Sequence, residues 1–223
     1  MCGRYALHSE LNVLQQQFNL DISRLDYSPH YNIAPSQQVL TVTGNGKRRA
    51  ESMRWGLIPF WAKEQKVGYR MINARSETLG ERPAYRSSMR RQRCLILADG
   101  FFEWSRKGKG RTPMYIYMAS GEPFAFAGLW SSWTSPDGSE IRSCTIVTTD
   151  ANEAISPFHN RMPVILSPET ESLWLDPYTE TLADLSHLFK SAPTDLLEVY
   201  PVSTMVNSPQ NDTPDVLHRA QLL

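Results

Sequence analysis

Residues 93–104 read RCLILADGFFEW and carry the clearest fold signal in the chain. The apolar run over 93–98 is typical of a buried strand. The pair Asp99-Gly100 that follows is typical of a tight turn, and a second apolar run starts at Phe101. We therefore expect two antiparallel strands joined as a β-hairpin.

Further strand-like segments lie on both sides of this stretch. They cover residues 38–43, 114–118, 124–130, 143–149, 162–166 and 199–203. The first of them is followed by Gly44-Asn45-Gly46, a sequence that predicts a turn.

Helices are expected between and after these strands. The first begins at Ser9, its expected N-cap, and repeats apolar residues at helical spacing through Phe18. The second begins at residues 167–169, which read SPE and combine an N-cap, a proline and an acid. The third begins at Thr179 and carries its apolar side over 182–189. Because the elements show no βαβ period, the sequence favours an α+β fold with an antiparallel β-sheet core and flanking helices.

Length and composition fit one globular domain. The chain has 223 residues, of which 41% are hydrophobic and 21% charged. No run of about 18 apolar residues exists, so we expect no membrane span. Three widely spaced cysteines argue against a disulfide framework, and no signal peptide is recognisable. The cytoplasm is therefore the expected location.

Charge is distributed unevenly although the net charge is zero. Residues 1–111 hold 19 Lys and Arg against 9 Asp and Glu, whereas residues 112–223 hold 4 against 14. A face built mainly from the first half would suit a phosphate-bearing partner. Alternatively, the two halves neutralise each other across the fold.

Cys2 is the residue with the most distinctive chemistry. Methionine aminopeptidase removes Met1 when the second side chain is small, and this would leave a cysteine with both a free α-amine and a thiol. The reference pKa of the amine is about 7.7–8.0 and that of the thiol about 8.5, so both are partly deprotonated near neutrality. Such a 1,2-aminothiol condenses with an aldehyde to an imine that the thiol closes into a thiazolidine, or it attacks an acyl group. A Met-Cys start also arises by chance, so other residues must support this interpretation.

Two segments place polar side chains where chemistry is possible. In an extended segment, Asn73 and Arg75 would share one face; as the alternative, they are a loop Asn and a surface Arg. Glu103 stands among three aromatic residues, where burial would raise its pKa toward the range of a general acid or base. Its alternative is a Glu on the solvent face of an alternating strand.

Two more segments combine cations with rings. His159 and Arg161 would share a face just before a predicted strand, which makes His159 a candidate for proton transfer, although a lone His is more often structural. Residues 54–63 read RWGLIPFWAK and offer rings such as Trp61 for base stacking and cations for phosphates. The alternative for this segment is a hydrophobic plug under a loop.

Motifs for cofactors and metals are absent from the sequence. It contains no paired-cysteine or zinc-protease motif, no phosphate-binding P-loop, no dinucleotide-binding glycine motif and no serine nucleophile elbow. We therefore expect neither a metal nor a cofactor, and this absence favours Cys2 as the reactive group.

Six short segments, taken in order, carry a family resemblance. They are residues 1–5 (MCGRY), 31–35 (YNIAP), 55–59 (WGLIP), 72–78 (INARSET), 98–104 (ADGFFEW) and 159–163 (HNRMP). Together with residues 202–203 and 206–207, they resemble the ordered signatures of the SOS-response-associated peptidase (SRAP) family over nearly the whole chain.

The resemblance implies one SRAP-like domain over residues 1–223, with an antiparallel, barrel-like β-sheet core. It implies a protein that senses and shields abasic sites in single-stranded DNA through a covalent thiazolidine crosslink from Cys2, after Met1 is removed. It assigns Cys2, Asn73, Glu103 and His159 to the reaction centre. In this interpretation, His159 helps to open the sugar ring and Glu103 supplies a proton for dehydration.

The resemblance also implies how DNA is held and where the protein works. It assigns Arg4, Arg75 and Arg161 to DNA phosphates and Trp61 to a base. The expected partner is single-stranded DNA containing abasic sites, bound by a monomer without a membrane or a cofactor. The expected activity is crosslinking of a lyase type, with autoproteolytic removal of Met1, in a cytoplasmic protein that joins the nucleoid when bound to DNA.

Other functions fit Cys2 as well. An N-terminal-nucleophile amidohydrolase or a peptidase would also use Cys2 as its nucleophile, and glutamine amidotransferases likewise begin with Cys followed by Gly. A reversible single-strand binding module with a structural Cys2 is the non-enzymatic alternative.

Overall fold

The computed structural model describes residues 2–22, 25–44, 46–105, 111–179 and 181–220. The strands are β1 (Tyr5–Leu7), β2 (Leu20–Asp21), β3 (His30–Ile33), β4 (Gln38–Thr43), β5 (Arg48–Trp55), β6 (Asn73–Arg75), β7 (Arg93–Ala98), β8 (Gly100–Ser105), β9 (Thr112–Met118), β10 (Phe124–Thr134), β11 (Glu140–Asp150), β12 (Arg161–Pro163), β13 (Ile165–Leu166) and β14 (Leu197–Pro201). The α-helices are α1 (Leu11–Phe18), α2 (Pro83–Arg91), α3 (Pro168–Leu175) and α4 (Leu182–Leu185). Short 3₁₀ turns are η1 (Gln65–Arg70), η2 (Ser76–Thr78), η3 (Ser186–Phe189), η4 (Thr194–Leu196), η5 (Thr204–Asn207) and η6 (Pro214–Leu217).

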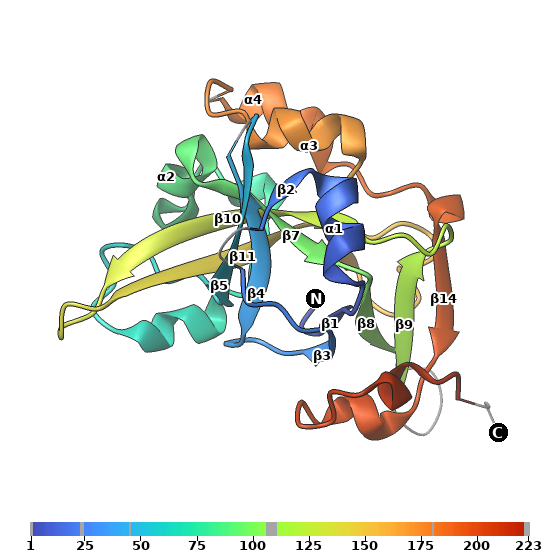
Figure 1. Cartoon of the computed structure of the whole chain (residues 1–223). Coiled ribbons are helices and arrows are strands. Elements are labelled where there is room, and N and C mark those ends of the chain that lie inside the picture. Colours follow the sequence, from blue (N-terminus) through green and yellow to red (C-terminus); the bar gives the residue numbers. More distant parts are fainter. Residues whose placement is uncertain (1, 23–24, 45, 106–110, 180, 221–223) are drawn as a thin grey trace.

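Five strands close into a barrel. They pair in the order β11-β10-β7-β4-β5, and a further pairing joins β5 back to β11. The first four contacts are antiparallel and the closing one is parallel. Five strands cannot alternate in direction all the way round, so one parallel pair is a geometric necessity. The expected antiparallel, barrel-like core is thus confirmed, with flanking helices α3 and α4 above it and α1 at its side (Figure 1).

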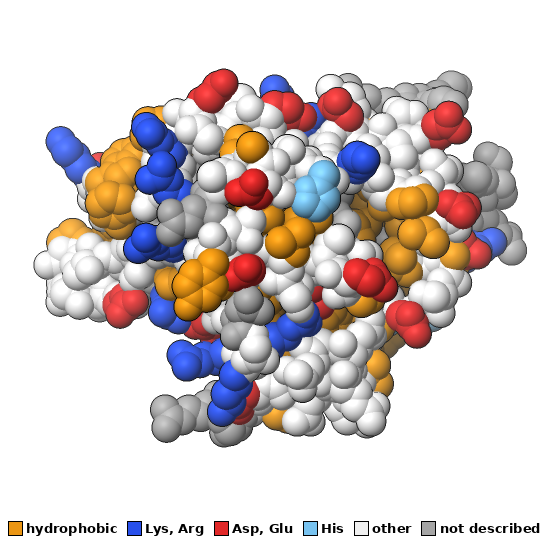
Figure 2. All heavy atoms as spheres, turned by 90° about the horizontal axis from the view of Figure 1, so that it is seen from above, with side chains coloured by type: hydrophobic (Ala, Val, Ile, Leu, Met, Phe, Trp, Pro, Cys, Tyr) orange, Lys and Arg blue, Asp and Glu red, His pale blue; other side chains and the backbone are white. Residues whose placement is uncertain are grey.

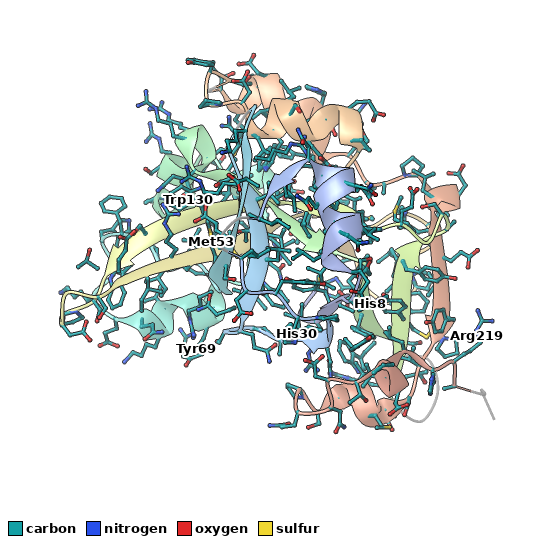
Figure 3. All side chains as sticks on the ribbon, in the orientation of Figure 1. His8, His30, Met53, Tyr69, Trp130 and Arg219 are labelled. Carbon is teal, nitrogen blue, oxygen red and sulfur yellow. The ribbon has the colours of Figure 1, made fainter. Side chains whose placement is uncertain are left out.

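A second sheet packs beside the barrel, with strand order β14-β9-β8-β1-β3. Successive side chains of a strand point to opposite faces. Phe101 accordingly meets Phe126 of the barrel at 6.0 Å between ring centroids, whereas Phe102 belongs to a smaller cluster with residues of the C-terminal segment. Both faces of this sheet are therefore covered. His8 directly follows β1, and His30 is the first residue of β3 (Figure 3).

The predicted hairpin over 93–104 is wrong, although both of its strands exist. β7 pairs with β10 and β4, whereas β8 pairs with β9 and β1 in the other sheet. Only Asp99 separates the two strands, and it is buried. Its carboxylate accepts hydrogen bonds from the backbone N–H groups of His8 and Ser9, at 2.5 and 2.7 Å. Asp99 is therefore the corner at which one continuous chain passes from the barrel to the second sheet.

Gly100 is required at this corner because there is no room for a Cβ atom. A Cβ atom at Gly100 would lie 2.4 Å from the ring of Tyr115, which is itself buried. The glycine that suggested a turn therefore marks a close approach between β8 and β9.

The helices are present but two of their starts differ from the prediction. α1 begins at Leu11 with Glu10 as N-cap, and Ser9 instead donates its hydroxyl to Asp99. α3 follows Ser167 with proline in its first turn, as expected. The last helix begins after Thr181, two residues beyond Thr179, and continues as η3 after only four residues.

The remaining strand predictions are confirmed with adjusted ends. The segment 162–166 is split into β12 and β13, and the segment 199–203 is a strand that starts at Leu197 and ends at Pro201. In the predicted turn, Gly44 and Gly46 have φ angles of +87° and +86°, and Asn45 lies outside the described residues.

The two interpretations of the uneven charge, a basic face and neutralisation between the halves, are each partly correct. Arg48 pairs with Glu171 at 2.5 Å, and Arg161 pairs with Glu77 at 2.6 Å, so ion pairs do join the two halves. Seen from above, however, Lys and Arg side chains gather on one side of the molecule, the side on which α2 lies (Figure 2). No helix in the described ranges is long and apolar enough to cross a membrane.

Candidate active site

Cys2 is held inside the protein at the junction of the two sheets. It has no exposed surface, and its Sγ lies 3.7 Å from the carbonyl oxygen of Arg4. The side-chain amide of Asn73 donates to the Cys2 carbonyl oxygen at 2.8 Å. The backbone of Cys2 is thereby fixed from β6, a strand 71 positions further along the chain.

Glu103 is brought to Cys2 by the pairing of β1 with β8. Tyr5 is opposite Phe101, so Glu103 falls beside the residues that precede Tyr5. Only 5% of Glu103 is exposed, which confirms the expected burial among aromatics and contradicts the solvent-facing alternative.

The environment keeps the Cys2 thiol protonated. Burial raises its pKa strongly, and the neighbouring Glu103 carboxylate raises it further. A thiolate at Cys2 would therefore need a base to take its proton as it forms. Glu103 is the acidic group whose charge acts on this thiol.

Asn73 has hydrogen-bonding capacity left for a substrate. Its Nδ2 holds Cys2 and its backbone carbonyl accepts from the hydroxyl of Tyr85 at 3.3 Å. Its Oδ1 is buried and has no hydrogen-bond partner within the described part of the chain. Buried polar atoms are rarely left unpaired, so this oxygen is suited to a donor on the substrate.

His159 lies just before β12, with its tautomer set by the backbone. Nδ1 accepts a hydrogen bond from the backbone N–H of Arg161 at 2.9 Å. In a neutral ring this leaves the proton on Nε2. β12 and β6 both pair with the last residues of β11, so Asn73 on β6 and the segment that leads from His159 into β12 are held by the same strand.

Arg161 is almost fully buried, with 7% of its side chain exposed. Its guanidinium donates to Glu77 at 2.6 and 3.0 Å, to Asp150 at 2.7 Å and to the carbonyl of Thr148 at 2.6 Å. These contacts fasten β12 to η2, the turn that follows β6. Its buried Nε has no hydrogen-bond partner among the described residues, and a phosphate contact by Arg161 stays a prediction.

Arg4 and Arg75, the other two arginines, differ in how many contacts their guanidinium groups make within the protein. Arg4 donates to Asn32 at 2.8 Å and to the carbonyl of Val206 at 2.6 Å, and it lies over the Trp104 ring at 6.0 Å. Arg75 is exposed and makes no ion pair with any described residue. Of the three, Arg75 is the most available to an incoming phosphate.

Trp61 lies on the surface of the protein. Trp61 is 55% exposed and Phe60 64%, whereas Trp55, Leu57 and Ile58 of the same segment are fully buried. The segment is thus a hydrophobic plug in its first part and an exposed pair of rings in its second. The turn is fixed by Trp133, whose indole donates to the carbonyl of Ala62 at 2.6 Å.

Asn32 has a role that the sequence reasoning missed. It is fully buried, and its Nδ2 donates to the carbonyls of Ser208 at 2.9 Å and Asn211 at 2.7 Å, while its Oδ1 accepts from Arg4. Asn32 therefore joins Arg4 to the C-terminal segment. The sequence feature that could have pointed to Asn32 was its position inside the YNIAP segment. A buried side-chain amide needs several hydrogen-bond partners, so such a residue connects other parts of the chain.

Glu77 was missed in the same way. It follows Arg75 within INARSET, and its pairing with Arg161 connects the two segments that carry Asn73 and His159. Among the described side chains, no three His, Cys, Asp or Glu groups come together in a way that could hold a metal ion.

Comparison with protein families and curated proteins gives a consistent result. The model of the family "SOS response associated peptidase (SRAP)" matches residues 1–209. The abasic site processing protein YoqW of Bacillus subtilis (strain 168) is 46% identical over 221 residues, covering 97% of this chain and 99% of its own. YobE of the same organism is 44% identical, covering 94% and 98%. The abasic site processing protein HMCES of Gallus gallus is 34% identical, covering 86% of this chain and 66% of its own.

Solved structures share the fold. A protein from Bacteroides thetaiotaomicron superposes with a TM-score of 0.89 at 25% identity, covering 99% of this chain and all of the other. A phage-related protein from Bordetella bronchiseptica superposes with a TM-score of 0.70 at 29% identity, covering 90% and 94%. With the family model spanning almost the entire chain and curated relatives matching over nearly full length, this chain belongs to the SOS response associated peptidase family.

Proposed function

We propose that this protein processes abasic sites in single-stranded DNA by forming a thiazolidine crosslink through Cys2 once Met1 has been removed. The observation that carries the proposal is the arrangement around Cys2. Its backbone carbonyl is held by Asn73, and its thiol lies under the influence of the Glu103 carboxylate. The names of the curated relatives, abasic site processing proteins, support the choice of substrate.

Removal of Met1 would place the α-amine on the residue that Asn73 already fixes. The amine adds to the C1′ aldehyde of the ring-opened deoxyribose to give a carbinolamine. The buried Oδ1 of Asn73 is an acceptor for the amine or for the carbinolamine hydroxyl. Because both nucleophiles sit on one residue, the second addition is intramolecular and favoured by proximity.

Glu103 serves twice in the proposed sequence. As an acid, it gives its proton to the carbinolamine hydroxyl, which leaves as water, and the nitrogen lone pair forms the iminium ion. As a carboxylate, it then takes the proton of the Cys2 thiol while sulfur adds to the iminium carbon. Glu103 ends protonated as it began, and the net change is loss of one water. The raised thiol pKa makes this second step necessary.

His159 acts on the sugar in this proposal. An abasic site is mostly a closed hemiacetal. Opening it breaks the C1′–O4′ bond while the C1′ hydroxyl gives its proton to water and becomes the aldehyde oxygen. Negative charge develops on the ring oxygen O4′, which then takes a proton from water. Nδ1 accepts from the Arg161 backbone, so a neutral ring carries its proton on Nε2, and this Nε2–H group is the proposed donor to that oxygen. A neutral imidazole can stabilise developing negative charge in this way.

Arg4, Arg75 and Arg161 are the proposed phosphate ligands, with Trp61 as a stacking surface. Contacts to phosphate and stacking on an aromatic ring carry little sequence information. This suits a protein that must act wherever a base is missing.

The test uses purified protein lacking Met1 and three substrates: abasic single-stranded DNA, intact DNA of the same sequence, and glutamine. A denaturant-resistant adduct with abasic DNA alone is expected. Glutamine hydrolysis without an adduct would indicate an amidohydrolase, and binding without any covalent product would indicate a reversible binding module.

A further inference from the structure

A basic groove lies between the outer side of α2 and the turn that carries the exposed rings. It has a volume of about 860 Å³. Its aromatic and charged lining residues are Phe60, Trp61, Glu81, Arg86, Arg90 and Arg91. The lining thus combines three arginines and one carboxylate with two exposed rings.

The arginines of α2 follow a helical repeat. Arg82, Arg86 and Arg90 are four residues apart, so they lie about 6 Å from one another along one side of the helix. All three are exposed, and no described residue forms an ion pair with Arg86 or Arg90. Helix-dipole stabilisation accounts for a cation in the last turn such as Arg90. It does not account for Arg86, which lies in the middle of α2.

The inner side of the same helix is tied to the reaction centre. Tyr85 and Met89 are buried against the core, and the Tyr85 hydroxyl donates to the Asn73 carbonyl at 3.3 Å. Asn73 in turn holds Cys2. One helix therefore contacts the strand that fixes the nucleophile and presents Arg86 and Arg90, which have no described ion-pair partner, on its other side.

We propose that this groove binds the sugar–phosphate backbone of the DNA segment that flanks the abasic nucleotide. The inference rests on the proposed function and adds a second contact region to it. Arg86 and Arg90 contact successive phosphates, while the rings at 60–61 stack on bases of the same segment. A row of cations opposite aromatic rings is the combination that single-stranded nucleic acid requires. The gathering of Lys and Arg on this side of the molecule is consistent with it (Figure 2).

The experiment measures binding without chemistry. The ligands are single-stranded oligonucleotides carrying a tetrahydrofuran abasic analogue, which has no aldehyde. One covers only the lesion and its nearest neighbours, and the other extends well beyond them on both sides. Arg86→Ala and Arg90→Ala should each weaken binding of the long ligand several-fold and lower the magnitude of its salt slope by about 0.7. Binding of the short ligand should not change.

Two control variants test the direction of the change in binding and its location on the protein. Glu81→Gln removes the carboxylate from the groove and should strengthen binding of the long ligand. Arg219→Ala removes an exposed cation that stacks on Tyr200 at the opposite end of the molecule from α2, and it should have no effect (Figure 3).

Crosslinking of the short oligonucleotide with a true abasic site separates this inference from the proposed function. The arginine variants should crosslink the short substrate at the wild-type rate. If they do, but the long ligand binds them as tightly as wild type, the groove is not a DNA site and the chemistry stands. If wild type forms no adduct at all, the proposed function fails, whatever the groove binds.

Discussion

Cys2 has a buried thiol whose proton must be removed and a backbone that a distant asparagine fixes. Both features lead to a prediction for its variants. Cys2→Ala should form no stable crosslink with abasic DNA but keep weak binding, because the arginines remain. Cys2→Ser should form an imine that borohydride traps and that hydrolysis otherwise reverses. Denaturing electrophoresis with and without borohydride distinguishes the two, and a stable adduct of Cys2→Ala would mean that another nucleophile reacts.

The pH dependence of the thiol follows from the direction of its pKa. Since burial and the Glu103 carboxylate both raise the Cys2 pKa, the thiolate fraction at a given pH is smaller than for an ordinary cysteine. Alkylation of Cys2 by iodoacetamide should therefore keep accelerating above pH 9, where an ordinary thiol of pKa about 8.5 levels off. Glu103→Gln removes one of the raising causes and should speed alkylation at pH 8. Peptide mapping by mass spectrometry reports the rate, and an unchanged rate would show that Glu103 does not act on the thiol.

Glu103 and His159 should be separable by the form of the substrate. Dehydration follows ring opening, so Glu103→Gln should slow adduct formation even when the substrate is a permanently open aldehyde. His159→Ala should slow only the reaction of the closed hemiacetal and should lengthen the life of the finished adduct. General acid–base groups contribute about 10²–10⁴-fold, which single-turnover kinetics resolve. Equal losses for both variants on the open aldehyde would contradict this division.

The INARSET, ADGFFEW and HNRMP segments were singled out because each contains a polar group in an apolar or patterned setting, and the first two hold Asn73 and Glu103, which act on Cys2. The partners of those groups could not be read in the same way. Arg161 finds Glu77 and Asp150, which are 84 positions before it and 11 before it. The pairing of β6 and β12 with β11 decides which carboxylates lie close to the buried guanidinium. That pairing cannot be predicted from the local sequence.

The connection from β7 to β8 shows where strand patterns mislead. Two apolar runs around Asp-Gly have the sequence of a hairpin, and each run is indeed a strand. Pairing, however, is chosen by long-range contacts, and the barrel supplies β7 with partners on both sides. The same limit explains Ser9, whose hydroxyl binds Asp99 at the corner and does not cap α1.

Gly100→Ala tests the corner. The added Cβ would meet the buried Tyr115 ring at 2.4 Å, so the free energy of unfolding should fall by at least about 2 kcal/mol. Gly80→Ala is the control, because its Cβ would meet only the end of the Leu182 side chain at 3.2 Å and should cost less than about 1 kcal/mol. Chemical denaturation measures both. Equal stability of the two variants would mean that β8 and β9 can separate at this point without cost.

The link between β12 and η2 can be tested with a pair of arginines. Arg161→Ala leaves the Thr148 carbonyl without its donor, while Glu77 and Asp150 are 49% and 84% exposed and regain water. We expect a loss of about 1–3 kcal/mol in the free energy of unfolding. Arg75→Ala, from an exposed residue with no described ion-pair partner, should change stability by less than about 0.5 kcal/mol while weakening DNA binding. If both variants lose only DNA affinity, Arg161 is a phosphate ligand and its ion pairs are secondary.

The molecule as a whole combines a closed barrel with a second sheet in which β1, between β8 and β3, brings the start of the chain into the interior. Composition and element type were sufficient to predict an α+β protein, since periodicity is a local property. Closure of the barrel by the parallel β5–β11 pair and the position of α2 beside the exposed rings emerge only once all strands are assembled. The excess of Lys and Arg in the first half of the sequence likewise becomes a surface feature only in the folded molecule, because α2 places several of these arginines on one side.

Intact mass spectrometry of the reaction with an abasic single-stranded oligonucleotide tests the covalent chemistry of Cys2. The account predicts one new species whose mass is that of the protein without Met1 plus the oligonucleotide minus one water. Its peptide map should place the modification on Cys2, with both the amine and the thiol blocked. A variant with one extra residue before Cys2 should give no such species. An adduct that forms equally well with that variant, or one that leaves the Cys2 thiol open to alkylation, would contradict the thiazolidine assignment.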